Sequence, residues 1–535
     1  MLNAPRYSRL WDWSSLLACT WMIATGAALQ ARVHLNHDVA WILHGARWLL
    51  TGARFGHDII DVNPPLIWFV SLPAAWLVNA GLCTEAEALR LYVWTLCAAS
   101  LLLCHRLLRP LRVRGEATES AGLLMGATFA MAMLPGAVFG QREHFAFVLG
   151  LPYCLLMATR LSGDEVRSRT LAIGCGVLGG VAFGLKPWFL AVPLLLELTQ
   201  LAKTRTLRGA WRAETVALAA TLMAYLLAVL VLAPEYLSVV VPMGIATYWA
   251  YDDSLPAWIH WRTPAFAVVV ALAFLGIARR FPPHAVVLAT AFAGFSFSHW
   301  AQRKGFAYHA YPALACAVTL LGYAVVLGTR ALSSVRWPIA GWVKVAMATC
   351  AVCVGLNFAR IWYLHVTDWA RLYDMDQGDI GSFRSHLIAR INATVPPGGR
   401  VYAFSSHPFP AFPTMSYTAA EWGSPMVGQF AMPALMMRDE VHDPELQVEI
   451  DRAVQAQREQ VVQDFERSAP AMVLVTTGPD RLGMHGRDFD DLAFYTAEPR
   501  FAAIWQQYAE ANSFGPLRVF VRRDSADPAK AAWNH

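Results

Sequence analysis

The sequence predicts a polytopic α-helical membrane protein that carries a soluble α/β domain at its C-terminus. Only 15% of the 535 residues are charged and 56% are hydrophobic, whereas soluble domains carry roughly 25% charged residues. The shortage of charge is confined to residues 10–365, where apolar runs approach the length of about 20 residues that a bilayer requires. From 366 onward the composition is that of a soluble domain, so we expect two domains, 1–365 and 366–535.

The apolar runs give about eleven candidate membrane-spanning helices. They cover residues 14–33, 86–105, 120–138, 144–160, 170–185, 187–202, 213–233, 263–279, 284–300, 306–328 and 337–363. Arg6 and Arg9 precede the first run, which is long and has no clear cleavage site after it. We therefore expect a spanning helix with a cytoplasmic N-terminus rather than a signal peptide. An odd number of spans then places the C-terminal domain outside, in the periplasm of a bacterial cell.

The distribution of basic residues supports this orientation. Loops predicted to be cytoplasmic are rich in arginine and lysine, as the positive-inside rule requires. The short outer loops carry few cations: Arg47, Arg54, Arg142, Lys186, Arg262, Arg303 and Lys304. Residues 64–80 are apolar but interrupted by Pro73, and a span there would place the basic loop 105–119 outside. We therefore assign 34–84 to one long outer loop whose last part lies along or dips into the membrane surface.

Composition also argues against several other classes of protein. The net charge of +5, with no basic tract interleaved with aromatics, gives no case for nucleic-acid binding. Eight of the nine cysteines lie in or beside apolar runs, which argues against a disulfide framework. The spacing of Gly174, Gly176 and Gly179 matches that of a dinucleotide-binding fingerprint, but these residues lie inside a predicted membrane helix. Close helix packing is the better interpretation there.

The first outer loop carries the most informative carboxylate. Residues 39–50 have helical periodicity with an apolar face that suits a membrane surface, and Asp38 directly precedes them. Aspartate is a favoured N-cap, and a capping carboxylate at the membrane boundary can also serve as a base. Asp58 and Asp61 lie near a Pro-Pro sequence, where turn formation explains them and sugar or acceptor binding is the alternative. We rank Asp38 above both as the catalytic base.

A second polar stretch, 139–147, lies between two apolar spans on the predicted outer side. It contains Gln141, Arg142, Glu143 and His144, and ionisable groups at membrane depth cost about 2.5–3.5 kcal/mol each. A turn needs no such cluster, so we favour a functional role over a local Arg–Glu pair that reaches water. Glu143 and His144 are adjacent donors of the kind that can bind a divalent cation such as Mg, Mn or Zn.

A third stretch, 298–312, combines Arg303 and Lys304 with His309 and neighbouring aromatics. Cations of this kind bind a phosphate and stabilise it as a leaving group. An ordinary interfacial belt is the alternative, but two adjacent cations on the side that the positive-inside rule disfavours count against it. Lys186 lies at a proline break between two apolar runs and is either a further phosphate contact or part of a turn. Asp252 lies in an aromatic-rich outer loop that suits sugar binding or an interfacial belt equally well.

These features together resemble the GT-C superfamily of membrane glycosyltransferases. The shared pattern is a first outer loop with an Asp before an amphipathic helix, a Pro-Pro-Leu element at 64–66, two spans and then an acidic motif. The branch with aminoarabinose transferases and protein O-mannosyltransferases is the most similar. The resemblance implies catalytic roles for Asp38 and Glu143 and contacts between the donor phosphate and Arg303 or Lys304. The chain departs from the pattern where Val39 follows Asp38 and where Asn63 precedes the prolines.

The resemblance also implies a reaction and its partners. A polyprenyl-phosphate sugar would lie with its lipid between helices, and Arg303, Lys304, His309 and Lys186 would bind the phosphate. Asp38 would accept a proton from the hydroxyl of a glycan, lipid or protein acceptor. Members of the superfamily that need a metal use acidic residues of the second motif, which correspond to Glu143 here.

The sequence predicts that the C-terminal domain is an accessory α/β domain. Its predicted strands are 400–405, 471–477 and 517–522, and its predicted helices are 381–392, 444–467 and 499–511. The stretch 405–430, rich in proline and aromatics, is either a long surface loop or a contact for the acceptor. Two other functions remain open at this point: a transporter or flippase of lipid-linked saccharides, and a non-catalytic scaffold for envelope assembly. The transporter is disfavoured because the polar clusters lie at the ends of spans and no repeat is visible.

Overall fold

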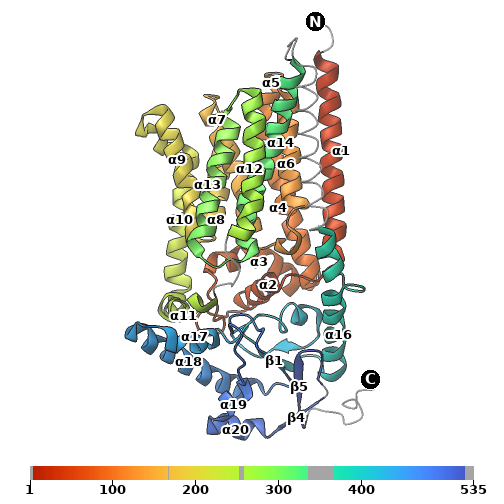
Figure 1. Ribbon diagram of the computed structural model, residues 1–535, viewed down its shortest axis with the longest axis vertical. Helices are drawn as coiled ribbons and strands as arrows, with labels where there is room; N and C mark the ends of the chain where they lie inside the picture. Colours follow the sequence, from red (N-terminus) through yellow and green to blue (C-terminus); the bar gives the residue numbers. More distant parts are fainter. Residues whose placement is uncertain (1–3, 167, 252–257, 335–365, 512, 525–535) are drawn as a thin grey trace. The chain divides into compact units, whose positions relative to one another are not determined.

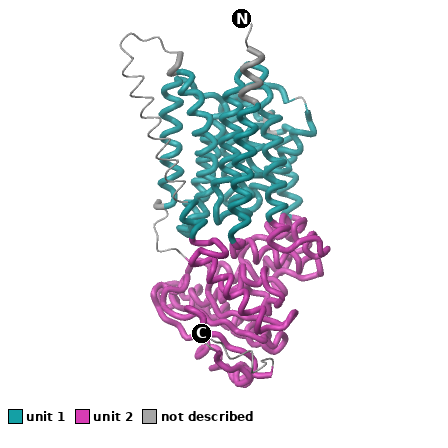
Figure 2. Tube along the Cα trace, turned by 90° about the vertical axis from the view of Figure 1, so that its right-hand side faces the viewer, with its two compact units in different colours: residues 1–33, 90–226, 254–371 teal, residues 34–89, 227–253, 372–535 magenta. Residues whose placement is uncertain are grey.

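The computed structural model describes residues 4–166, 168–251, 258–334, 366–511 and 513–524. The chain divides into two compact units, drawn in teal and magenta in Figure 2. The first, which we call the membrane unit, comprises residues 1–33, 90–226 and 254–371. The second, which we call the α/β unit, comprises 34–89, 227–253 and 372–535. The first outer loop thus folds with the C-terminal residues, from which it is separated by some 280 positions of sequence.

Long apolar helices build the membrane unit (Figure 1). They are α1 Ala4–Ala31, α4 Glu85–Leu107, α6 Ala117–Ala132, α7 Arg142–Leu161, α8 Arg169–Gly184, α9 Ala191–Thr204, α10 Ala213–Leu232, α12 Trp258–Ala278, α13 Pro283–Gln302 and α14 Tyr311–Ser334. Each of the first ten predicted spans overlaps one of these helices, which confirms the polytopic helical fold. Five described segments are long and apolar enough to cross a membrane: Glu85–Leu107, Arg142–Leu161, Ala213–Leu232, His260–Ala278 and Ala307–Ala331. The eleventh predicted span, 337–363, lies outside the described residues, so the number of spans stays a prediction.

Small residues allow the membrane helices to approach closely. A methyl group on Gly176 of α8 would lie 2.3 Å from the carbonyl oxygen of Glu214, and one on Gly179 would lie 3.0 Å from the ring of Tyr153. These contacts confirm helix packing at Gly176 and Gly179, whereas Gly174 has nothing within 4 Å of an added methyl group.

A five-stranded sheet forms the core of the α/β unit. The strand order is β2-β1-β3-β5-β4, with bounds β1 Arg400–Phe404, β2 Glu421–Trp422, β3 Met472–Thr476, β4 Tyr508–Glu510 and β5 Leu517–Arg522. Strands β2, β1 and β3 are parallel, whereas β5 is antiparallel to both β3 and β4. The three predicted strands are therefore confirmed, and β2 and β4 were not predicted.

Helices and two hydrophobic clusters of described residues complete this unit. The helices are α2 His37–Leu49, α3 Pro65–Asn79, α11 Val241–Thr247, α16 Asp379–Thr394, α17 Met432–Met437, α18 Pro444–Ser468, α19 Asp491–Thr496 and α20 Pro499–Trp505. Phe465 of α18 and Phe501 of α20 pack on Phe404 of the sheet. The predicted helix 499–511 is too long, because the chain leaves the helix after Trp505 and pairs with β5 as strand β4.

Helix α2 is a core element rather than a surface helix. Trp41, Ile42 and Ala46, which the sequence assigns to a membrane-surface face, are at most 4% exposed. Trp41 packs edge-on against Trp68 of α3 and lies beside Phe412 of the C-terminal part of the unit. The predicted membrane-surface role of this face is wrong, since the apolar side of α2 is buried within the α/β unit.

A buried carboxylate on α18 gives this unit a testable pH dependence. Asp464 is fully buried, and its Oδ1 accepts a hydrogen bond from Gln460 (2.8 Å) and pairs with Arg467 (3.3 Å). Burial outweighs these contacts and raises the pKa of Asp464 to about 7. The unfolded chain releases this proton near pH 4. The folded state therefore binds more protons between about pH 4 and pH 7, and stability falls as the pH rises through that window.

Asp464→Asn is expected to stabilise the chain at pH 8 by roughly 1–4 kcal/mol, because asparagine cannot ionise. The gain should shrink toward zero at pH 4, where Asp464 is protonated in the folded state and about half protonated in the unfolded state. Thermal unfolding of the detergent-solubilised chain at both pH values measures this difference. A gain of equal size at pH 4 and pH 8 would contradict the assignment to ionisation.

Candidate functional site

A buried ion pair lies at the start of α7 in the membrane unit. Glu143 occupies the first turn of α7 and is 1% exposed, a position where the helix dipole favours a carboxylate. Lys186 lies between α8 and the 3-10 helix η2 Pro187–Leu190, where Pro187 breaks the helix. Its Nζ lies 2.5 Å from Oε1 of Glu143, and Nε2 of His309 lies 4.0 Å from the same oxygen. Three segments that are distant in sequence thus converge on one carboxylate.

Further contacts fix the position of Lys186. Its ammonium group donates a hydrogen bond to Oε1 of Gln302 (2.8 Å). The amide of Gln302 in turn donates to the carbonyl oxygen and the hydroxyl of Ser298 on α13. The ammonium also lies 5.6 Å from the ring centroid of Tyr308, within range of a cation–π interaction. Lys186 is therefore held by an anion, an amide and an aromatic face.

Further cations lie in this region. Besides Lys186, the side chains of Arg142 and Lys304 are near enough to act electrostatically on the buried His309. Lys304 is itself 8% exposed. Cations removed from water need an anion nearby, because uncompensated buried charge is costly. Charge-assisted bonds from such groups are suited to a phosphate. We call Arg142, Glu143, Lys186, Lys304 and His309 the basic cluster.

Two further predicted residues, Arg303 and His144, lie near this cluster in the sequence. Arg303 is the exposed, left-handed C-cap of α13 (φ 51°), and its contact with the donor phosphate stays a prediction. His144 is fully buried, and its Nδ1 accepts a hydrogen bond from the backbone N–H of Gly140 (3.1 Å). Its Nε2 lies 3.0 Å from the carbonyl oxygen of Met131. Both ring nitrogens thus contact backbone groups, and a role of His144 as a metal ligand or a sugar contact stays a prediction.

The donors around Glu143 do not fit a divalent cation. Lys186 already compensates the carboxylate, and His144 has no free nitrogen. In the part of the chain that the structure describes, no group of three or more His, Cys, Asp or Glu side chains is placed to hold a metal ion. A need for Mg, Mn or Zn therefore stays a prediction from the resemblance, and no step below uses a metal.

Asp38, the predicted base, lies in the α/β unit. It occupies the first turn of α2 rather than the N-cap, because Oδ1 of Asn36 caps the helix by accepting from the N–H of Asp38 (2.9 Å). The carboxylate is a quarter exposed, and Oδ1 lies 3.5 Å from Nε2 of His37. Asp38 is therefore not required as the cap of α2.

Two residues beside Asp38 were not predicted as site residues. The ring of His407, from the loop after β1, lies 4.3 Å from the ring of His37 between centroids. Arg384 of α16 is 8% exposed, and its guanidinium lies over the rings of Tyr373 and Phe409. Burial lowers the pKa of His37 and of His407 to about 3, and the charge of Arg384 acts in the same direction. Both imidazoles are therefore neutral at physiological pH, so Asp38 has polar but uncharged rings beside it.

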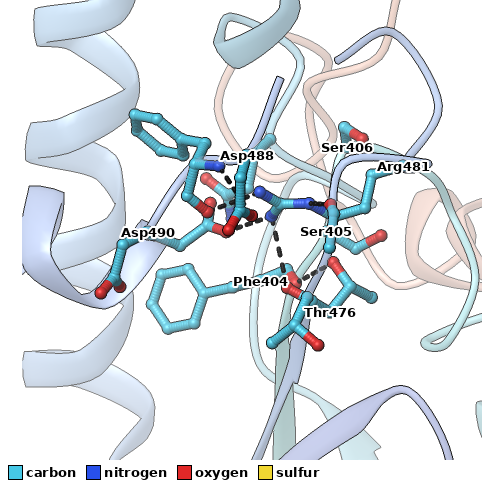
Figure 3. Close-up of polar contacts among 12 residues, drawn as sticks. Phe404, Ser405, Ser406, Thr476, Arg481, Asp488 and Asp490 are labelled. Atoms are coloured by element: carbon cyan, nitrogen blue, oxygen red, sulfur yellow. Dashed lines mark hydrogen bonds and ion pairs between the residues drawn. The ribbon is translucent and has the colours of Figure 1, made fainter. Parts of the chain in front are cut away.

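The loop that carries His407 is tied to the loop after β3 (Figure 3). Arg481 donates to Oδ2 of Asp491 (2.5 Å), to the carbonyl oxygen of Phe489 (2.5 Å) and to that of Gly478 (3.1 Å). Ser406 next to His407 donates to the carbonyl oxygen of Leu482 (2.6 Å). The buried Arg481–Asp491 pair thereby fixes the segment against which the His407 loop rests.

Arg481→Met is expected to destabilise this region by about 3–5 kcal/mol, because it leaves the buried carboxylate of Asp491 without its partner. Chymotrypsin should then cleave the full chain faster within 477–491. Arg487→Met is the matched control, since Arg487 pairs with Glu440 at the surface, where such a pair contributes about 0–1 kcal/mol. Equal cleavage rates for the two variants would contradict this role of Arg481.

The remaining predicted carboxylates divide into turn residues and one undescribed position. Asp61 is buried and accepts hydrogen bonds from Nε1 of Trp41 (2.8 Å) and from the N–H of Asn63 (2.7 Å), which matches its structural interpretation. Asp58 accepts from the N–H of Arg54 and pairs with the ring of His57 (2.8 Å), and its side chain is partly exposed. Asp252 lies outside the described residues.

Comparison with known proteins gives a fold but no sequence family. No family model matches the chain, and no curated protein matches it. The solved structure of ArnT from Cupriavidus metallidurans bound to undecaprenyl phosphate is similar over 100% of both chains, with 13% identity and a TM-score of 0.56. The apo structure of the same protein covers 98% of this chain and 100% of its own, with 14% identity and a TM-score of 0.49. ArnT is an aminoarabinose transferase of the GT-C superfamily. The likeness to the lipid-bound structure confirms the GT-C fold that the first outer loop implies.

Proposed function

We propose that this GT-C-fold membrane protein transfers a sugar from a polyprenyl-phosphate donor to a hydroxyl of an envelope acceptor, on the outer face of the bacterial inner membrane. The observation that carries the proposal is the basic cluster, in which the buried cations Lys186 and Lys304 lie around Glu143 and His309. The similarity to an ArnT structure with bound undecaprenyl phosphate supports a lipid phosphate as the anion that this cluster takes.

The basic cluster is proposed to hold the donor phosphate. Lys186 and Lys304 provide positive charge in a site largely removed from water, where electrostatic interactions are strong. Glu143 positions Lys186 and prevents the lysine from turning toward solvent before the donor arrives. The phosphate gains negative charge as the glycosidic bond breaks, so preformed cations stabilise the transition state more than the ground state.

The proposed reaction is a single displacement. An acceptor hydroxyl oxygen attacks the anomeric carbon of the sugar, and the bond between that carbon and the phosphate oxygen breaks. The electron pair of this bond leaves with the polyprenyl phosphate, which Lys186 and Lys304 stabilise. The hydroxyl proton goes to the carboxylate of Asp38. The neutral rings of His37 and His407 add no positive charge that would weaken Asp38 as a base.

Membranes that contain the overexpressed chain test this function. They are supplied with a polyprenyl-phosphate sugar labelled in the sugar, together with crude envelope acceptors. The label is expected to move from the lipid to the acceptor fraction with wild type and not with empty-vector membranes. Label that crosses the membrane while still attached to lipid would instead identify a transporter.

A further inference from the structure

A cavity of about 890 Å³ lies wholly within the α/β unit. The first outer loop forms one wall, with residues 44–58, and the C-terminal part forms the opposite wall, with residues 415–425. Its size is in the range of roughly 300–1,000 Å³ that is usual for small-molecule sites. None of the residues of the basic cluster lines it, nor does Asp38.

The formal charges in the cavity wall balance. Three arginines line the cavity together with three carboxylates: Arg47, Arg400, Arg467, Asp58, Glu85 and Glu421. Arg47 lies 2.5 Å from Glu85, and Arg400 lies 3.7 Å from Glu421. Arg467 pairs with Asp464 beneath the wall, and Asp58 pairs with His57. A wall with balanced charge does not select a phosphate or a cation. We therefore expect the cavity and the basic cluster to bind different kinds of ligand.

The wall offers many hydrogen-bonding groups. Glu85 is 5% exposed, and its Oε1 pairs with His44 (3.1 Å) as well as with Arg47. The hydroxyl of Ser416 lies close enough to the Glu85 carboxylate to act as its hydrogen-bond donor. Strand β2 also lines the cavity, and it is one of the two edge strands of the described sheet. An outermost strand has backbone N–H and C=O groups without a strand partner on one side.

Trp48 adds an apolar face to this polar wall. Its indole ring lines the cavity and is held edge-on by Trp41 and His44. Aromatic side chains of this kind combine an apolar body with polar surroundings. A pyranose ring has the complementary surface, because its hydroxyl groups lie around the rim and its C–H groups form an apolar face.

We propose that this cavity binds a neutral saccharide segment. Paired carboxylate–arginine groups, backbone groups at a strand edge and one aromatic face together match a ring of hydroxyl groups better than an anion, a cation or an apolar ligand. The role of this saccharide as part of the acceptor rests on the proposed function. The binding itself does not.

Saturation-transfer NMR on the full chain in detergent tests the binding. The probes are maltotriose, mannotriose and chitotriose, with inorganic phosphate as a competitor. Signals from at least one trisaccharide are expected, and phosphate should not displace it. Ala419→Trp, at an exposed position in the wall, should weaken the signal by about tenfold or more by filling the cavity. Ala497→Trp is the matched control at an exposed position outside the cavity, and it should leave the signal unchanged.

The outcomes separate this inference from the proposed function. No signal from any trisaccharide, or equal signals from wild type and Ala419→Trp, would overturn the saccharide site even if the chain transfers sugar. Displacement by phosphate would instead identify an anion site and would likewise overturn it. Binding that Ala419→Trp abolishes, in a chain without transferase activity, would support the site and refute the proposed function.

Discussion

Lys186→Met is expected to lower the rate of sugar transfer by about 10²–10³-fold, because it removes a preorganised cation from the departing phosphate. Methionine has a similar length and no charge, so it also leaves the buried Glu143 without its partner. The measurement compares initial transfer rates at saturating donor, with matched amounts of folded protein shown by size-exclusion chromatography. Lys203→Met is the control, since Lys203 is an exposed cation at the end of α9.

Two companion variants distinguish phosphate binding from a structural role of the ion pair. Lys186→Arg keeps the charge and should retain part of the activity. Glu143→Gln keeps the shape of the carboxylate and loosens Lys186, so its main effect should be on donor affinity. A Lys186→Met variant that folds and transfers sugar at the wild-type rate would show that the ion pair serves only the stability of the membrane unit.

Asp38→Asn is expected to lower the transfer rate by about 10²–10⁴-fold, the usual contribution of a general base. Asn36 caps α2, so the substitution leaves the helix start intact. Donor affinity should therefore stay close to that of wild type. Asp439→Asn is the matched control, because Asp439 is an exposed carboxylate that pairs with Arg438 at the surface and does not line the cavity.

An active Asp38→Asn variant would remove Asp38 from the mechanism. Glu143 would then be the remaining carboxylate of the predicted catalytic pair. Loss of donor binding in the same variant would show instead that Asp38 has a structural role, which the transfer rate alone does not reveal.

The membrane helices were predictable because their signal is local. Ten runs of apolar residues, each near the thickness of a bilayer, correspond to described helices. The same local reasoning failed for α2, because an apolar helix face looks the same whether it meets lipid or protein. Trp41 is buried by Trp68 and by Phe412, and the second of these comes from a segment far away in the sequence. Strand β4 was missed for a related reason, since only its pairing with β5 defines it.

The candidate site was predictable only where its residues are of a type that is unusual for their position in the sequence. Glu143 and Lys186 attracted attention as ionisable groups at the ends of membrane helices, and the structure pairs them. His144 is also an ionisable group at the end of a membrane helix. Its ring nitrogens contact two backbone groups, however, and no sequence pattern reveals these contacts. Arg384 and His407 were missed because an arginine in a helix and a histidine in a loop are ordinary. Only the fold brings them beside His37.

The most direct test of the central claim follows the donor lipid itself. The purified chain is incubated with a polyprenyl-phosphate sugar and an envelope acceptor, and mass spectrometry quantifies free polyprenyl phosphate and glycosylated acceptor together. The account predicts that wild type forms both products in equal amounts and that Lys186→Met and Asp38→Asn form neither at an appreciable rate. A donor that stays intact in the presence of every envelope acceptor fraction, with a folded protein that still binds undecaprenyl phosphate, would contradict the claim that this chain is a glycosyltransferase.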